Sequence, residues 1–393
     1  MKVAIYTLGC KVNQYETQAM EQELRRRGHE VVPFAGEADA YVVNSCSVTA
    51  VSDQKSRQML HRIRREHPAA VAALCGCYSQ THPSRNVVWD AKLERQVAFL
   101  SDDICAGRAT GSKGGTEAAA FIARRFGEIG LEPLHGGESH KSYFQSFRTP
   151  NGVAGHNVIG FFNGSRKLRE SRYVIVGAHF DNLGTMGGKV YRGADANASG
   201  VVAALSLAEM LKMAALLGKA YSRSIIFVAF DGRNNGLSGA QTFWKSLSDG
   251  MFKDPHTGRT IWPEAVDVMV NLDQLGCTSS PLESGREDYL LAVDNGTLKD
   301  ADRNLIDWAN RIFEVNLQLC HDYYGSENFT KVFFKITDVY PFSSNGIPSV
   351  MFTSGITMNN NKPYDDASTL NYPVFRKRIY LIFHWLEVLI RHK

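Results

Sequence analysis

Three unbroken apolar segments in the second half of the chain constrain its fold more than any other feature. They are residues 173–179 (YVIVGAH), 223–230 (RSIIFVAF) and 266–272 (VDVMVNL), and each leads into a loop with an ionisable side chain. Apolar runs without alternation are typical of strands that helices cover on both faces. A long helical pattern, residues 199–217, precedes the second of them. The sequence therefore predicts an α/β fold with a doubly wound, mostly parallel sheet.

Ionisable residues cluster where these strands end. Ligands of such sheets bind beyond the carboxyl ends of the strands, where His179 and Asp273 lie. Asp181 stands two residues after His179, so its carboxylate can orient the imidazole. Asp195 precedes the helical pattern and adds a third loop. One imidazole and two carboxylates from three loops match the ligand types of a zinc site, although a lone H-x-D is also common in a surface loop.

Five motifs in this region occur in a characteristic order. They are G-A-H-x-D at 177–181, G-A-D-x-N-A-S-G at 193–200, F-x-A-F-D-G at 227–232, N-L-D at 271–273 and G-I-P-S-V at 346–350. Together they resemble the di-zinc aminopeptidases of peptidase family M28, a superfamily that also includes glutaminyl cyclases. The resemblance covers residues 88–393. It implies that His179, Asp195 and Asp273 bind the first zinc and that Asp195 bridges to a second.

The chain departs from that family at the positions that carry the chemistry. Where the family has Asp-x-Glu-Glu-x-Gly-Leu, this chain reads DGRNNGL, so Arg233 replaces the general-base glutamate and Asn234 replaces a second-zinc ligand. The closing histidine of the second zinc aligns with Asn361. The family's Ser-Asp-His before the last strand reads Thr337, Asp338, Val339 here. An arginine cannot accept the proton that hydrolysis requires.

These replacements leave several functions open. The domain is predicted to be a catalytically silent peptidase relative, a weak aminopeptidase with a single zinc ion, or a normal aminopeptidase. In the silent case Arg233 supplies the missing positive charge to Asp195 or Asp273. A silent domain would be a binding module for a peptide or small molecule.

The first 82 residues form a separate pattern. Short apolar runs at residues 2–7, 40–43 and 71–74 alternate with helical patterns at 18–27 and 56–65, which predicts a small α/β unit. An unpatterned polar stretch follows Cys77. We therefore expect two domains, residues 1–82 and residues 83–393.

Three cysteines of this first unit, Cys10, Cys46 and Cys77, each follow a predicted strand. Three thiolates can hold an iron–sulfur cluster, while buried free cysteines are the alternative. The segments TLGCKVNQYET, NSCSVTAVSDQKSRQ and GCYSQ resemble the amino-terminal domain of tRNA methylthiotransferases acting on threonylcarbamoyl-adenosine. The resemblance implies a four-iron cluster on those cysteines. That family's radical-SAM motif CxxxCxxC is missing, and the unit stops before its last strand, so tRNA methylthiolation is not expected.

Bulk properties narrow the class of protein further. A formal charge of +4 over 393 residues gives no argument for nucleic acid as a partner. Four of the seven cysteines lie in the first 80 residues, which favours metal binding and a reducing, cytoplasmic compartment over a disulfide framework. The amino terminus lacks a signal-peptide pattern. No apolar stretch is expected to reach the roughly 20 residues that span a membrane.

Overall fold

The chain divides into two compact units in the computed structural model. The first comprises Met1–Arg85 with Leu216–Gly218, and the second comprises Asn86–Ala215 with Lys219–Lys393. The structure describes residues 1–8, 11–45, 55, 58–59, 62–63, 65–67, 70–76, 87–134, 142–164, 171–216, 218–278, 285–294, 296–323 and 326–391.

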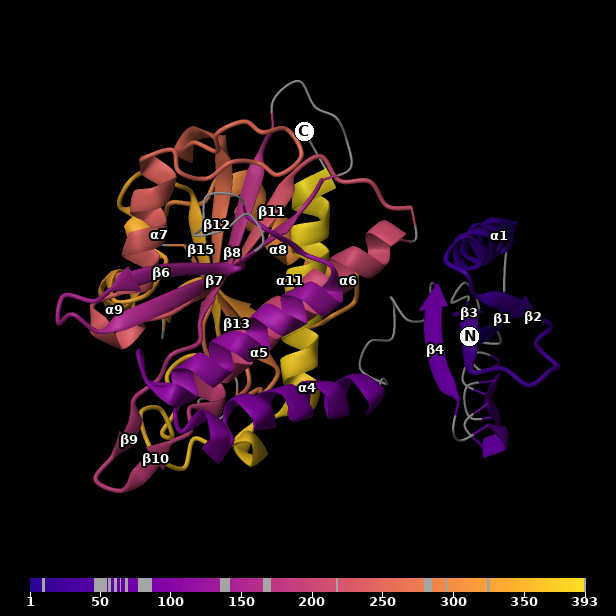
Figure 1. The fold of residues 1–393 in the computed structure, drawn as a ribbon, viewed down its shortest axis with the longest axis horizontal. Coiled ribbons are helices and arrows are strands. Elements are labelled where there is room, and N and C mark those ends of the chain that lie inside the picture. The colour runs from indigo at the N-terminus through magenta and orange to yellow at the C-terminus, as the bar shows by residue number, and fades with distance from the viewer. Residues whose placement is uncertain are drawn as a thin grey trace. The chain divides into compact units, whose positions relative to one another are not determined.

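The first unit contains a four-stranded sheet in the order β2-β1-β3-β4, and each described pairing is parallel. Its elements, drawn in indigo to purple in Figure 1, are β1 (Lys2–Thr7), α1 (Lys11–Arg26), β2 (Glu30–Val32), β3 (Ala40–Ser45) and β4 (Val71–Gly76). Tyr41 and Val43 of β3 are fully buried in its small core. The three strands expected from the apolar runs are confirmed, whereas the three-residue β2 is too short to be evident from the sequence.

The second unit is built on a nine-stranded sheet in the order β14-β13-β15-β12-β8-β11-β7-β5, with β6 paired to β7 (Figure 1). Its strands are β5 (Glu132–Pro133), β6 (Phe144–Arg148), β7 (Ala154–Phe162), β8 (Tyr173–His179), β11 (Ser224–Phe230), β12 (Val266–Leu272), β13 (Tyr289–Val293), β14 (Gln318–Cys320) and β15 (Ser349–Thr353). A separate hairpin is formed by β9 (Gly184–Met186) and β10 (Lys189–Tyr191).

Parallel pairing is confined to the middle of the sheet and to one edge. The central strands β15, β12, β8 and β11 are parallel, and so are β13 and β14. The β7 pairings and the β13–β15 pairing are antiparallel. The sheet is therefore mixed, and the predicted parallel arrangement is found where the three apolar segments lie. Every residue of β8 and β11 is buried, as expected for strands covered on both faces.

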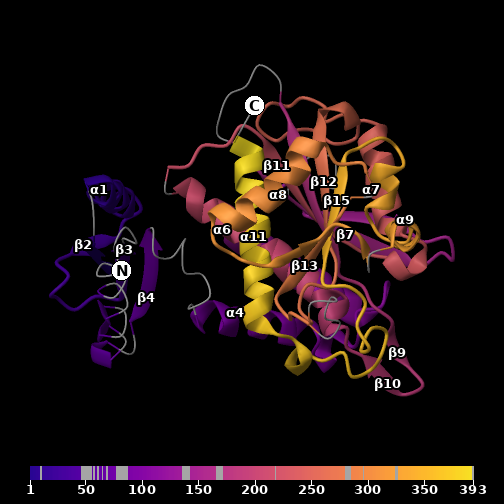
Figure 2. The same ribbon diagram turned by 180° about the vertical axis from the view of Figure 1, so that it is seen from behind.

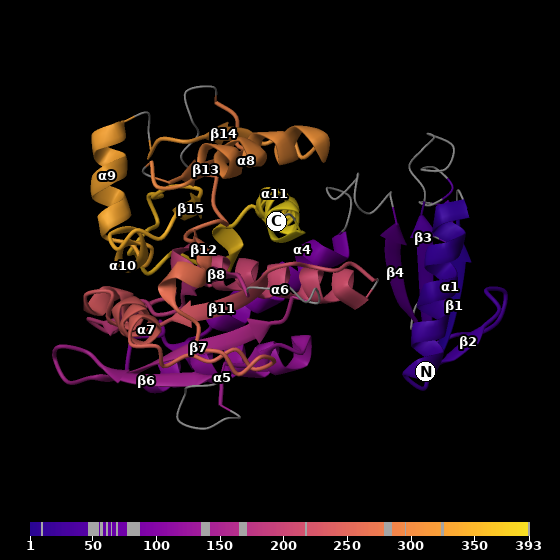
Figure 3. The same cartoon turned by 90° about the horizontal axis from the view of Figure 1, so that it is seen from above.

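Helices cover both faces of this sheet. Figure 2 shows α6, α8 and α11 over one face, and Figure 3 shows α7, α9 and α10 on the opposite side. The helices are α4 (Val87–Leu100), α5 (Lys113–Ile129), α6 (Gly200–Leu216), α7 (Ser238–Ser248), α8 (Asp300–Ile312), α9 (Glu327–Lys335), α10 (Tyr340–Ser343) and α11 (Tyr372–Arg391). The predicted α/β architecture with helices on both faces is confirmed.

The helical segment Ala194–Leu216 corrects one expectation. Among the described residues it is the one helix long and apolar enough to cross a membrane, although no apolar stretch of that length was expected from the sequence. Its apolar character comes from small and branched residues that pack into the core, and 67% of its most apolar window is buried inside the protein. Core helices of this kind satisfy the same length and composition test as membrane spans.

Candidate active site

Two of the predicted metal ligands lie side by side at the carboxyl edge of the central strands. His179 ends β8, and Asp273 directly follows the neighbouring parallel strand β12. Both side chains are buried, and Nε2 of His179 lies 3.5 Å from Oδ1 of Asp273. They meet because the carboxyl ends of adjacent parallel strands share one edge of the sheet.

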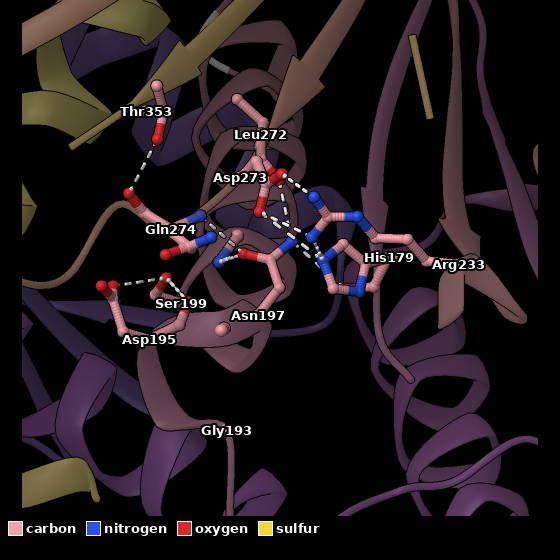
Figure 4. Close-up of polar contacts among 12 residues, drawn as sticks. His179, Gly193, Asp195, Asn197, Ser199, Arg233, Leu272, Asp273, Gln274 and Thr353 are labelled. Carbon is pink, nitrogen blue, oxygen red and sulfur yellow. Dashed lines mark hydrogen bonds and ion pairs between the residues drawn. The ribbon is translucent and has the colours of Figure 1, made fainter. Parts of the chain in front are cut away.

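Asn197 fixes the spacing between these two strand ends. Its side-chain amide donates to the carbonyl oxygen of His179 at 3.2 Å and to that of Leu272 at 2.9 Å. Its Oδ1 accepts from the backbone N–H groups of Gly200 and Gln274 at 3.0 and 2.9 Å (Figure 4). One fully buried side chain therefore ties three loops of the site together, a role that the motif containing it did not reveal.

Arg233 places its guanidinium between His179 and Asp273. It follows β11 in the short turn Arg233–Asn235, which glycines with positive φ precede and follow. Nη1 lies 2.7 Å from Nε2 of His179, and Nη2 lies 3.1 Å from Oδ2 of Asp273. Figure 4 shows the guanidinium directed at both side chains. Of the two partners predicted for Arg233, Asp195 and Asp273, the guanidinium contacts Asp273.

Asp181 organises both the histidine and the Arg233 turn. Its backbone carbonyl oxygen lies 3.0 Å from Nδ1 of His179, and its Oδ1 lies 3.6 Å from the same nitrogen. Its carboxylate also accepts the backbone N–H groups of Arg233 and Asn234 at 3.1 and 3.2 Å. Asp181 is therefore placed where it was expected, although the closer contact to the ring is made by its backbone.

The protonation state of His179 follows from these contacts. Burial and Arg233 oppose protonation, but Asp181 and Asp273 outweigh them and raise the pKa of His179 to about 9. A protonated His179 disagrees with the 2.7 Å distance between its Nε2 and Nη1 of Arg233, because both nitrogens would then be N–H donors and could not bond to each other. We assign a neutral ring with its proton on Nδ1, since Nε2 then accepts from Arg233 while Nδ1 donates to the carbonyl of Asp181.

Asp195 is bonded outside this cluster, and its role as a shared zinc ligand stays a prediction. Its Oδ1 accepts from the backbone N–H groups of Gly276 and Cys277 at 2.8 and 3.2 Å, and from Oγ of Ser199 at 3.2 Å. Figure 4 shows it pointing away from His179. Its backbone N–H is in turn held by Asp365 at 2.8 Å. The carboxylate is directed by these amides, which come from the loop after β12.

Asn234 and Asn361, the two positions where the sequence predicts lost zinc ligands, lie apart. Asn234 sits beside the cluster, with Nδ2 3.3 Å from Oδ2 of Asp181. Asn361 lies in an exposed turn with φ of 57°, and no hydrogen bond or ion pair of the described residues joins it to His179 or Asp273. The structure therefore brings together only part of the site that the sequence predicts.

The residues present do not fit a zinc ion. In the described part of the chain, no group of three or more His, Cys, Asp or Glu side chains has the geometry of a metal site. Asp195 is turned away, and the Arg233 guanidinium fills the space between the two remaining ligands.

A further buried carboxylate lies near the cluster and was not predicted as a site residue. Asp338, between α9 and α10, is fully buried, and neither of its oxygens has a hydrogen-bond partner among the described residues. Burial raises its pKa to about 6, while the charge of Arg233 acts against that rise. The sequence contains one indication of this residue, the segment Thr337-Asp338-Val339. From the sequence, that segment indicated only the absence of a histidine at position 339.

The predicted iron–sulfur ligands cannot be placed. Cys10, Cys46 and Cys77 lie outside the described residues, and the cluster stays a prediction.

A family model decides the identity of the second unit. Residues 157–386, more than half of the chain, match the model of peptidase family M28. The chain belongs to peptidase family M28. The resemblance found in its motifs is confirmed.

Solved structures of similar fold are zinc aminopeptidases and glutaminyl cyclases. A glutaminyl cyclase from Macrostomum lignano superposes with a TM-score of 0.59 at 18% identity, covering 80% of this chain and 94% of that one. The zinc aminopeptidase BSAP from Bacillus subtilis gives 0.57 at 12% identity, with 77% and 95% covered. The LapA aminopeptidase from Legionella pneumophila gives 0.56 at 13% identity, with 80% and 75% covered. At such identities the likeness establishes the M28-type fold.

The amino-terminal region has different relatives. Residues 2–95 match the model of uncharacterized protein family UPF0004. The threonylcarbamoyladenosine tRNA methylthiotransferase MtaB of Bacillus subtilis is 49% identical over 82 residues, which are 21% of this chain and 18% of that protein. MtaB of Aquifex aeolicus is 43% identical over 83 residues, 21% and 20% of the two chains. This chain spans about a fifth of the length of these relatives, and it joins their amino-terminal region to an M28 domain.

Proposed function

We propose that the M28 domain is catalytically silent because the guanidinium of Arg233 takes the place of the active-site metal ion. The observation that carries this proposal is the contact of Arg233 with both His179 and Asp273, at 2.7 and 3.1 Å. Hydrolysis by a metallopeptidase needs a metal-activated water and a group that accepts its proton. In this proposal the guanidinium of Arg233 occupies the place of the metal that would activate the water. Arg233 also stands where the proton acceptor is expected, and an arginine cannot accept a proton.

Zinc content and turnover test this proposal together. Protein purified without chelator should contain zinc well below one ion per chain, and it should release no product from aminoacyl p-nitroanilides above the buffer rate. One zinc per chain, together with turnover that a chelator abolishes and zinc restores, would support a mono-zinc aminopeptidase instead. Chelator-treated wild type is the matched control for adventitious metal.

A domain that has lost turnover can still bind. We propose a peptide or small molecule as its ligand, held without cleavage, and no role for nucleic acid or membranes. The proposed compartment is the cytoplasm, and the buried free thiols of Cys105 and Cys277 are consistent with a reducing environment. Isothermal titration with short peptides tests the first point, and absence of heat for a broad peptide set would argue against it.

The amino-terminal unit is proposed to be a partial methylthiotransferase-like domain that does not methylthiolate tRNA. Its support is that the match covers only about a fifth of the length of those enzymes. An anaerobic preparation tests whether it still holds a cluster, because a cluster held by thiolates gives a broad visible absorption band. No such band would remove the iron–sulfur prediction.

A further inference from the structure

Arg108 is a fully buried cation in the connection between α4 and α5. Its guanidinium donates to backbone carbonyl oxygens of three segments, which are Leu100 in α4, Phe180 after β8, and Arg192 and Gly193 after β10, the last three bonds being 2.7 Å long. Arginine carries five N–H donors in a planar fork, so one side chain can bond several carbonyl groups at once. Since a buried charge is costly unless it is hydrogen-bonded, these bonds favour one fixed arrangement of the three segments.

The backbone around Arg108 also holds the loop after β8. The carbonyl oxygen of Arg108 accepts the backbone N–H of Asn182 at 3.2 Å, and that of Gly107 accepts the backbone N–H of Gly184 at 3.0 Å. Gly107 has a φ of 71°, and a Cβ atom there would lie 2.5 Å from the carbonyl oxygen of Gly184. Only glycine permits this close approach. Side chain and backbone of residues 107–108 therefore fix the same loop.

That loop carries the residues of the Arg233 cluster. Phe180 stands between His179 and Asp181, so its carbonyl group belongs to the peptide bond that leads into Asp181. The 2.7 Å bond from Nε of Arg108 holds this peptide. Asp181 in turn contacts Nδ1 of His179 through its backbone oxygen at 3.0 Å, and its carboxylate accepts the backbone N–H of Arg233 at 3.1 Å. Arg108 is thus bonded to the peptide next to both contacts.

We propose that Arg108 is a positioning residue of the Arg233 cluster, because it fixes the peptide bond on which the orientation and tautomer of His179 depend. The inference rests on the proposed function, in which Arg233 occupies the place of the metal ion by bonding to Nε2 of that ring. A lysine at position 108 would keep the charge without the planar fork, so it could not hold carbonyl groups of three segments. The inference therefore concerns geometry rather than charge.

The experiment compares Arg108→Lys with Arg378→Lys by nitrogen NMR of the histidine rings. Arg378 is the matched control, because it is also fully buried and donates to backbone carbonyl oxygens, those of Tyr289, Leu275 and Cys277, at 2.7 to 2.8 Å. The signals of His179 are assigned by their loss in His179→Gln, and circular dichroism establishes that each variant is folded.

Wild-type His179 should show one neutral tautomer, protonated on Nδ1. Arg108→Lys should raise the share of the other tautomer by about fivefold, which is the effect of losing one typical hydrogen bond. Arg378→Lys should leave the His179 signals as in the wild type. A folded Arg108→Lys protein with wild-type His179 signals overturns the inference, and so does an equal change in Arg378→Lys.

Measurements on the wild-type chain decide the case in which Arg108→Lys does not fold. Nε and both Nη nitrogens of Arg108 are bonded to carbonyl oxygens, so their hydrogens should exchange slowly with water and give separate Nη signals. Slow exchange together with a single His179 tautomer supports the inference. A freely rotating guanidinium, or a mixture of His179 tautomers, overturns it. Stoichiometric zinc in wild-type protein would instead overturn the proposed function, so the two failures are distinguishable.

Discussion

Two neighbouring groups of buried aspartates in the M28 domain have opposite kinds of partners. In the Arg233 cluster, Asp273 is paired with a guanidinium and Asp338 has no hydrogen bond among the described residues. Asp195, in the loop before α6, and Asp365, between β15 and α11, accept backbone N–H groups at 2.8 to 3.2 Å. The first group balances charge with charge, and the second holds backbone in place. An aspartate should therefore be replaceable without loss of stability in the first group, whereas in the second group its replacement should weaken the loops that it holds.

The largest expected loss of stability comes from a substitution in the second group, the aspartates that hold backbone amides. Asp365→Ala removes the acceptor of two buried amides, those of Asp195 and Ala196, at 2.8 and 3.0 Å. Each buried donor left without a partner costs about 1–3 kcal/mol, so the free energy of unfolding should fall by about 4 kcal/mol. Urea unfolding at pH 8 measures it. The adjacent, more exposed Asp366→Ala is the control and should lose about 1 kcal/mol, because Asp366 caps a short turn and forms a partly exposed ion pair with Arg192 at 3.8 Å.

The second prediction concerns the Arg233 cluster, where a substitution is expected to raise the free energy of unfolding rather than lower it. Burial raises the pKa of Asp338 from 3.8 in the unfolded chain to about 6 in the folded protein. Proton binding by Asp338 therefore stabilises the folded protein fully below pH 3.8, and this stabilisation is lost as the pH rises through 6. Asp338→Asn, which stays neutral, should therefore stabilise the protein by about 3 kcal/mol at pH 8 and by almost nothing at pH 4.

Urea unfolding across pH 4 to 8 measures this difference. Asp300→Asn, at the exposed start of α8, is the control and should change stability by less than about 1 kcal/mol at either pH. A stability loss at pH 8 for Asp338→Asn would show that its charge is needed by the Arg233 cluster and would contradict the prediction.

The smallest effect sharpens the contrast within the structural group. Asp195→Asn keeps an oxygen that can accept from Gly276 and Cys277, and burial already raises the pKa of Asp195 and so favours its neutral form. The free energy of unfolding should change by no more than about 1 kcal/mol at pH 7. A loss as large as that of Asp365→Ala would mean that the charge of Asp195, rather than its oxygen, holds the loop.

Much of the fold and part of the site are evident from the sequence. The unbroken apolar segments predict β8, β11 and β12, because strands that are covered on both faces do not alternate apolar and polar residues. His179 ends β8, and Arg233 and Asp273 follow β11 and β12, so the sequence also predicts that all three lie at strand ends. The expected replacement of the general-base glutamate by Arg233 rests on one motif, DGRNNGL. These features are local, since they depend on residues close together in the sequence.

Only the tertiary structure decided which carboxylates belong to the site. Asp195 is aimed by the amides of Gly276 and Cys277, about 80 positions away, and Asp338 arrives from the connection between α9 and α10. The direction of a loop side chain depends on partners that another segment supplies, and no motif contains them. The sequence by itself determined the central parallel strands and placed Arg233 after one of them. Long-range hydrogen bonds decided that Arg233, and not Asp195, completes the pair of His179 and Asp273.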